Sequence, residues 1–113
     1  MIARFWRGVT KAKDANAYLE YLTQTGVNDI LKTEGNRGIH LLHRVNGDEA
    51  EFLFISLWDS LDSIRHFAGP HVEVAVYYPE DRAYLLELTP KVIHYEVEKF
   101  DVPQKSGAGI PSS

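Results

Sequence analysis

Short runs of branched and aromatic residues, separated by polar breaks, mark four segments that we predict as β-strands. Asn46-Gly47-Asp48 lies between the second and the third segment. An Asn-Gly pair supplies the positive backbone angles of a tight turn, so these two strands are expected to form a hairpin. The four predicted strands are residues 2–9, 38–45, 50–58 and 91–99.

A long helix is predicted between the first two strands, because apolar residues recur there at three- and four-residue spacing. Asp14 is suited to cap its first turn, and Gly35 is suited to end it. Gly26 interrupts the apolar stripe and indicates either a bend or a close packing contact.

Two shorter helices are expected after the third strand. Ser60 can cap a helix whose apolar face carries Leu61, Ile64 and Phe67, and Gly69-Pro70 stops it. A proline followed by acidic residues opens a second helical segment over residues 79–88. The stretch VEVAVYY, residues 72–78, suits a strand by propensity and a short helix by its polar and small positions, so the local pattern leaves both open.

The order βαββαβ, with one extra helical segment, predicts an α+β fold of the ferredoxin-like type with one four-stranded antiparallel sheet. Strands 2–9 and 50–58 are then central. The folded domain is predicted over residues 1–100. Residues 101–113 are rich in proline, glycine and serine, and we expect them to form a mobile tail.

Strand 50–58 is apolar on both of its faces. Leu53, Ile55 and Leu57 alternate with Phe52, Phe54 and Trp58. Helices of one chain cover only one face, so a second copy of the chain is the expected cover for the other, and we predict a homodimer. The alternative is a modest apolar patch on a monomer.

Composition and charge narrow the classes of function. Sixteen acidic and twelve basic residues give a net charge of −4 with no cluster of lysine or arginine, which argues against a nucleic-acid partner. The chain has no cysteine, which excludes disulfides, thiolate metal sites and a cysteine nucleophile. No long apolar run or signal-peptide pattern is present, so we expect no membrane partner and a cytoplasmic location.

The run FLFISLWDSLDSIRHFAGPHVEVAVYYPED, with IARFWRGV at the start and VIHYEVEKF at the finish, resembles the antibiotic biosynthesis monooxygenase-like family of the dimeric α+β barrel superfamily. Its most specific element is a strand-ending tryptophan, Trp58, followed by a serine-capped helix. The resemblance covers residues 1–100 and implies a dimeric α+β barrel. It also implies a helix over residues 71–77, against the local β propensity.

The resemblance implies two kinds of activity. Haem-degrading members use an asparagine on the first strand, the strand-ending tryptophan and a histidine that binds iron. Only Trp58 matches here, and the ligand position aligns with Tyr77; tyrosine binds ferric haem in other folds, so haem stays an alternative. Cofactor-free members deprotonate a phenolic or enolic substrate, whose carbanion reacts with dioxygen.

We therefore predict a cofactor-independent monooxygenase-like protein that acts on a small aromatic or polyketide-like substrate in an aromatic-lined pocket. The alternative is a non-catalytic homodimeric module that binds a small hydrophobic or aromatic ligand. The predicted catalytic base is His94, since histidine titrates near neutral pH; a structural histidine is the other reading. The predicted substrate-binding residues are Trp58, Tyr77, Tyr78, Arg4, Trp6 and His66, with a purely structural Trp58 as the alternative.

Arg4 and Arg7 lie three residues apart on one strand and so point to opposite faces of the sheet. One is expected to face the pocket and the other the dimer interface, with Glu96 or Glu98 as a partner. No metal site is predicted. His40 and His43 also face opposite sides of a strand, and His66 and His71 lack the spacing of zinc-binding helices.

Overall fold

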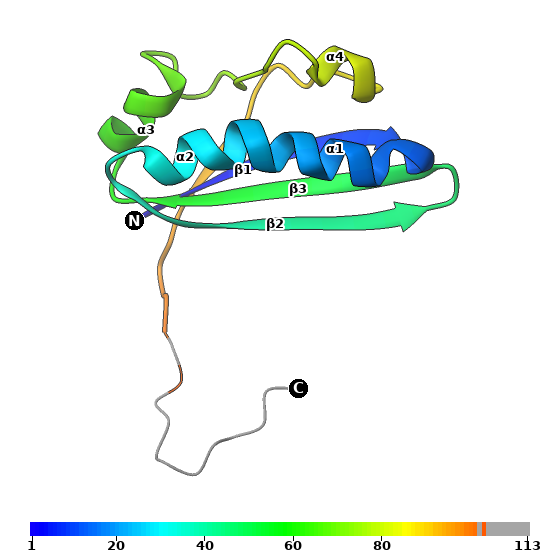
Figure 1. The fold of residues 1–113 in the computed structure, drawn as a ribbon. Coiled ribbons are helices and arrows are strands. Elements are labelled where there is room, and N and C mark those ends of the chain that lie inside the picture. Colours follow the sequence, from blue (N-terminus) through cyan, green and yellow to red (C-terminus); the bar gives the residue numbers. More distant parts are fainter. Residues whose placement is uncertain (102, 104–113) are drawn as a thin grey trace.

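The computed structural model describes residues 1–101 and 103, and the predicted tail beyond residue 101 therefore lies almost entirely outside the described residues. Four antiparallel strands form one sheet in the order β2-β3-β1-β4, and the helices cover one of its faces (Figure 1). This arrangement confirms the predicted ferredoxin-like α+β fold. The elements are β1 (Ile2–Lys11), η1 (Ala12–Asp14), α1 (Ala15–Leu22), η2 (Thr23–Val27), α2 (Asn28–Lys32), β2 (Asn36–Asn46), β3 (Glu49–Trp58), α3 (Leu61–Ala68), α4 (Asp81–Tyr84) and β4 (Ile93–Glu96).

The two central strands, β1 and β3, pair along their whole length, from Ile2 opposite Trp58 to Lys11 opposite Glu49. The predicted hairpin between β2 and β3 is confirmed, and Gly47 has the positive φ of 63° that the turn requires. The last strand, β4, pairs with the first residues of β1 and is shorter than the predicted segment 91–99.

The long helix is confirmed as one helical stretch, but its winding changes along the way. It begins as a short 3-10 turn, continues as α1, widens into the π-helical segment η2 and ends as α2. Gly26 lies in the π-helical segment, and a Cβ there would stand 3.8 Å from the rings of Phe54 and Tyr78. That distance is ordinary contact, so Gly26 marks the change in winding, and no steric need for glycine is evident.

The helix expected over residues 71–77 is wrong. The segment contains no helix: residues 72 and 73 form a turn, and Val74 forms an isolated antiparallel bridge with Lys91. The Ala75 amide donates to the Pro90 carbonyl at 3.0 Å, and the Val92 amide donates to the Glu73 carbonyl at 2.9 Å. Alternating valines disfavour a helix here, and these two hydrogen bonds pair the segment with residues 90–92 instead.

The helix predicted over residues 79–88 is confirmed only as the single turn α4. Leu85 forms a bridge with Thr10, and the Leu86 amide donates to the Val9 carbonyl at 2.9 Å. Near Val9 and Thr10 the edge of β1 has backbone groups that β4 does not reach. Leu85 and Leu86 pair with these groups, and this pairing ends the helix.

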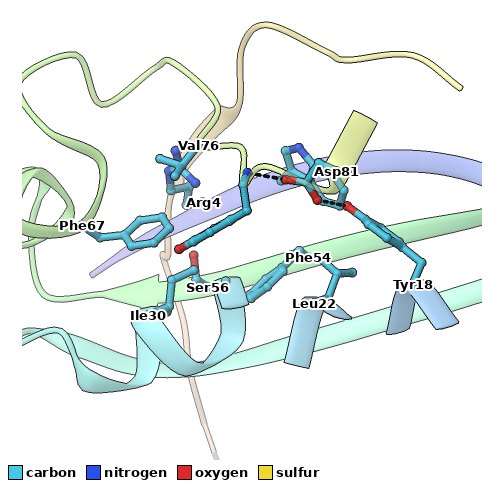
Figure 2. A pocket seen from close by; sticks show the side chains of 12 residues that line it. Arg4, Tyr18, Leu22, Ile30, Phe54, Ser56, Phe67, Val76 and Asp81 are labelled. Atoms are coloured by element: carbon cyan, nitrogen blue, oxygen red, sulfur yellow. Dashed lines mark hydrogen bonds between the residues drawn. The ribbon is translucent and has the colours of Figure 1, made fainter. Parts of the chain in front are cut away.

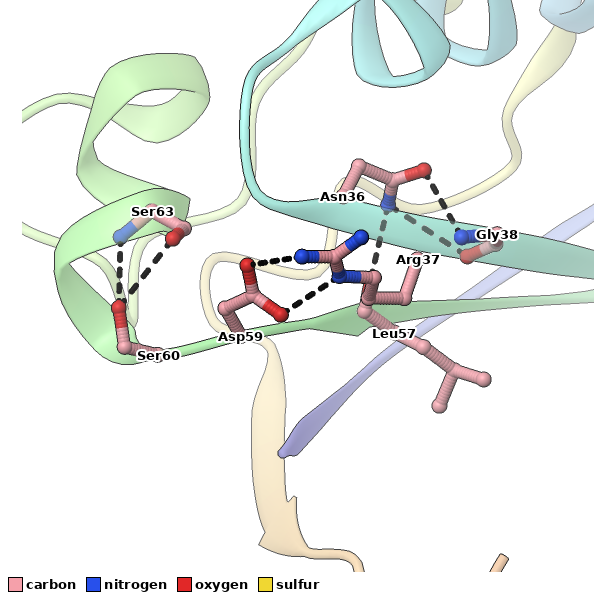
Figure 3. Close-up of polar contacts among 7 residues, drawn as sticks. All are labelled: Asn36, Arg37, Gly38, Leu57, Asp59, Ser60 and Ser63. Atoms are coloured by element: carbon pink, nitrogen blue, oxygen red, sulfur yellow. Dashed lines mark hydrogen bonds and ion pairs between the residues drawn. The ribbon is translucent and has the colours of Figure 1, made fainter.

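A network of polar side chains holds the corner where β2 begins and α3 follows β3 (Figure 3). Asn36 donates to the Leu57 carbonyl at 3.0 Å, and Arg37 binds both oxygens of Asp59 at 2.6 and 2.8 Å. The predicted cap is confirmed, because the Ser60 hydroxyl accepts from the Ser63 amide at 3.2 Å.

The two faces of the sheet differ in their cover. Under the helices, two clusters of buried side chains centre on Tyr18 with Phe52 and on Trp58 with Ile64. On the other face no element of the described chain lies over the sheet (Figure 1), and Ile93 and Tyr95 are 57% and 55% exposed.

Arg7 points to this open face, as one of the two arginines on β1 was expected to do. Its partner is Glu51, whose Oε2 accepts from Arg7 Nε at 2.5 Å, and Arg44 binds the other oxygen at 2.7 Å. The expected partners Glu96 and Glu98 are therefore wrong, since the register of β1 with β3 brings Glu51 beside Arg7.

Candidate functional site

A small cavity lies between the covered face of the sheet and the helical layer (Figure 2). Its volume is about 40 Å³, and it is bounded by β1, β3, the α1–α2 stretch and the chain from α3 to α4. Most of the wall is apolar or aromatic: Trp6, Leu22, Gly26, Ile30, Phe54, Phe67 and Val76. The polar side chains on the wall are Arg4, Tyr18, Ser56, Tyr78 and Asp81.

Arg4 places a buried cation on the wall of this cavity. The residue is 4% exposed, and its guanidinium lies 5.6 Å from the centre of the Phe67 ring. One Nη donates to the Val74 carbonyl at 3.1 Å, while Nε has no hydrogen-bond partner among the described residues. Burial lowers the pKa of Arg4 to about 10, so the side chain stays charged at neutral pH.

Asp81 places a buried carboxylate on the same wall. It is 3% exposed and accepts from the Tyr18 hydroxyl at 2.9 Å and from the Tyr78 amide at 2.6 Å (Figure 2). Burial, followed by the nearby Asp81, raises the pKa of Tyr18 above its ordinary value. The Tyr18 phenol therefore remains protonated and donates to Asp81 across the physiological range.

His94 lies beside Arg4 but outside the lining of the cavity. The two residues are partners across β1 and β4, so their side chains share the covered face. His94 Nε2 is buried and has no hydrogen-bond partner among the described residues. Burial and, to a lesser degree, the charge of Arg4 lower the pKa of His94, which makes the neutral imidazole the dominant form near neutral pH.

Three of the predicted substrate-binding residues line the cavity, namely Arg4, Trp6 and Tyr78. The Trp6 ring lies across Gly8, where a Cβ would come within 2.3 Å of it. The Tyr78 hydroxyl donates to Asp29 at 2.6 Å, and burial followed by Asp29 raises its pKa.

The other three predicted binding residues do not line the cavity. Trp58 is fully buried behind it, where its Nε1 donates to the Ser56 hydroxyl at 2.8 Å. Tyr77 accepts from Trp6 Nε1 at 3.3 Å and donates to the Thr89 carbonyl at 2.5 Å. His66 is exposed on α3.

Sequence reasoning missed the contributions of Tyr18, Ser56 and Asp81. The sequence pattern gives neither Asp81 nor Tyr18 a binding role, because an acid shortly after Pro79 and an aromatic residue in an apolar helical stripe are both ordinary structural features. The useful signal for Ser56 was its position, because it is the one polar residue on a strand face otherwise made of Phe52, Phe54 and Trp58.

The described residues do not fit a haem. A haem would need an iron ligand on the cavity wall. No histidine lines it, and the phenol of Tyr77, which aligns with the ligand position of haem-degrading proteins, is held by Thr89 and Trp6. In the part of the chain that the structure covers, no group of three or more histidines and carboxylates is placed to hold a metal ion.

None of the helices in residues 1–101 is both long and apolar enough to cross a membrane. No protein-family model matches the chain, and no curated protein matches its sequence.

Solved structures do resemble it. A candidate antibiotic biosynthesis monooxygenase from Bacillus cereus has a TM-score of 0.62 at 17% sequence identity, over 90% of this chain and 97% of that protein. The haem degrader MhuD from Mycobacterium tuberculosis, solved with two haems in its active site, has a TM-score of 0.55 at 19% identity, over 91% of this chain and all of that protein. A NIPSNAP domain protein from Burkholderia xenovorans has the same TM-score at 15% identity, with coverages of 91% and 100%.

These similarities extend over about nine-tenths of this chain and nearly the whole of each matching structure. They confirm the resemblance that the sequence predicted: the chain has the ferredoxin-like α+β fold of the antibiotic biosynthesis monooxygenase-like proteins.

Proposed function

We propose that the protein is a small monooxygenase-like enzyme that oxidises a small aromatic or polyketide-like substrate in the cavity between the sheet and the helices, without a bound cofactor. The observation that carries this proposal is the cavity itself, which has walls of aromatic rings and holds one buried cation, Arg4. Aromatic walls suit a planar apolar substrate, and a fixed cation stabilises an enolate or phenolate.

The proposed reaction needs a base and a dry site. His94 is the proposed base, because burial keeps it neutral and its Nε2 has no partner among the described residues. Removal of a proton from an activated CH₂ group leaves a carbanion that reacts with dioxygen. One oxygen atom becomes the carbonyl of the product and the other leaves as water, so that R₂CH₂ and O₂ give R₂C=O and H₂O.

The substrate must enlarge the cavity, because a volume of about 40 Å³ is too small for an aromatic ring. The wall formed by residues 69–80 is the proposed moving part. That segment has no regular helix or strand, and few backbone hydrogen bonds tie it to the rest of the chain. Entry of the substrate would displace this wall and bring His94 within reach of the reacting carbon.

We also propose a homodimer that forms through the open face of the sheet. A broad apolar groove of about 720 Å³ runs over this face, with Phe5, Leu53, Ile93 and Tyr95 on its surface. Large exposed apolar patches mark interaction sites, and a second copy of the chain is the proposed partner here. The cytoplasmic location expected from the sequence stays a prediction.

Oxygen uptake with anthrone, a small aromatic compound that carries an activated CH₂ group, tests the enzymatic proposal. We expect the protein to raise the rate of uptake above the spontaneous rate and His94→Gln to remove most of that increase, by about 100-fold or more. His66→Gln is the matched control and should leave the rate unchanged, because His66 is exposed and does not line the cavity. Full activity of His94→Gln would exclude His94 as the base.

A non-catalytic ligand-binding protein is the second candidate. The observation in its favour is that His94 does not line the cavity. Saturable binding of anthrone without oxygen uptake, under conditions where product is measured directly, would favour the binding protein.

A further inference from the structure

The cavity is lined by two buried charges of opposite sign that are not paired with each other. In residues 1–101, no carboxylate forms an ion pair with Arg4, and Asp81 is held by Tyr18 and the Tyr78 amide. The guanidinium makes one hydrogen bond, to the Val74 carbonyl, and leaves Nε without a protein partner.

A buried cation without a counter-charge is unfavourable. The free energy lost when the guanidinium leaves water exceeds the free energy gained from one hydrogen bond to a carbonyl and one contact with an aromatic ring. The residues around Arg4 do not supply a paired negative charge. Its neighbour across the strands, His94, is neutral near pH 7, and Glu73, the acidic residue that acts on His94, is exposed. Asp81 lies on the same cavity wall, but it forms no ion pair with Arg4 and accepts from Tyr18 and the Tyr78 amide instead. An anionic group in the cavity would supply the missing charge.

We propose that Arg4 is the anion-binding residue of the cavity and that the ligand is a monoanion, with a carboxylate or an ionised phenol or enol at the Arg4 end. This inference rests on the proposed function, since it concerns the same cavity and defines the charge of its ligand. The guanidinium has a planar array of donors that matches a carboxylate, and its Nε is available for one of the two bonds.

Asp81 limits the charge that the ligand can carry at the other end of the cavity. Its carboxylate is buried and repels a second negative charge. Tyr18 and the Tyr78 amide each use one of its lone pairs, and further lone pairs remain to accept from a hydroxyl. A dianion should therefore bind more weakly than a monoanion that carries a hydroxyl or an apolar group at this end.

Three probes test the inference: benzoate, benzyl alcohol as its neutral match, and acetate as the smallest carboxylate. Affinity is measured from the backbone amide NMR signals of β1 during titration. We expect benzoate to bind more tightly than benzyl alcohol, and Arg4→Met to weaken benzoate by about tenfold or more. Arg7→Met is the matched control on the opposite face of the same strand and should bind benzoate like the unmodified protein.

Arg4→Met should fold, because a long apolar side chain replaces an unpaired buried charge, and urea unfolding of the variant checks this. Arg4→Lys is the second variant. It keeps the positive charge but lacks the planar donors of arginine. Its affinity for benzoate should lie between that of the unmodified protein and that of Arg4→Met.

The outcomes separate this inference from the proposed function. Equal affinity for benzoate and benzyl alcohol, or undiminished benzoate affinity in Arg4→Met, would overturn the anion site and leave the aromatic pocket standing. Arg4-dependent binding of acetate alone would support the anion site and contradict an aromatic ligand. If none of the three probes binds, the anion site is wrong, whereas the proposed function fails only if anthrone is neither oxidised nor bound.

Discussion

Arg4 and His94 illustrate how burial on one face of the sheet gives two ordinary residues unusual properties. A charged residue on a central strand is unfavourable unless it is paired or faces a polar cavity, which is why the sequence already singled out Arg4. Its neighbour His94 is affected by the same burial and, in addition, by the positive charge of Arg4.

The lowered pKa of His94 makes the stability of the protein depend on pH. In the unfolded chain, His94 takes up a proton as the pH falls through about 6.5, whereas in the folded protein it stays neutral to lower pH. The unfolded state then binds more protons, so the free energy of unfolding falls as the pH falls below about 6.5 and levels off below the folded-state pKa.

Urea unfolding between about pH 5 and pH 8 measures this effect. We expect His94→Gln to lose less stability at low pH than the unmodified protein, and His66→Gln to retain the full dependence. The same pH dependence in His94→Gln and in the unmodified protein would show that His94 is not the group responsible.

Among the elements, α3 is the one whose cap matters to the cavity. Its first turn is held by the Ser60 hydroxyl, and Phe67 near its end lines the cavity beside Arg4 (Figure 3 and Figure 2). The position of an aromatic wall residue is thus linked to one side-chain hydrogen bond at the other end of a short helix.

Ser60→Ala should lower the free energy of unfolding by about 1 kcal/mol, because the Ser63 amide loses its acceptor. Ser60→Asp is the matched control, since aspartate is also a good capping residue, and should retain most of the stability. Both are measured by urea unfolding. Equal stability of Ser60→Ala and the unmodified protein would mean that water replaces the cap without loss.

For the whole molecule, the uneven cover of the sheet is the main consequence of the fold. One face is packed against helices, while the other exposes Leu42, Ile93 and Tyr95 at 48%, 57% and 55%. These residues come from the two edge strands and surround the half-buried centre of the same face. The surface is therefore continuous, as an interface requires.

Light scattering during size-exclusion chromatography should give twice the chain mass of 12.8 kDa. Ile93→Lys should shift the protein toward the monomer, because it buries a charge in the proposed interface. Leu31→Lys is the matched control, since Leu31 is similarly exposed but lies on α2, in the helical layer. A monomeric unmodified protein at all concentrations would contradict the proposed homodimer.

Local pattern predicted the elements where hydrogen bonding and side-chain period act within a few residues. The strands, the Asn-Gly turn and the Ser60 cap follow from such short-range physics, and so does the opposite orientation of Arg4 and Arg7. The order of these elements was enough to predict the sheet.

Long-range pairing decided what the local pattern left open. Residues 72–78 form no helix because Val74 pairs with Lys91, and the helix after Pro79 ends early because Leu85 pairs with Thr10. The cavity likewise depends on distant segments, since Tyr18 reaches Asp81 and Arg4 reaches Val74. The sequence by itself determined which residues form strands and helices; only the tertiary structure decided which charges are buried together, because burial depends on what the rest of the chain places around a side chain.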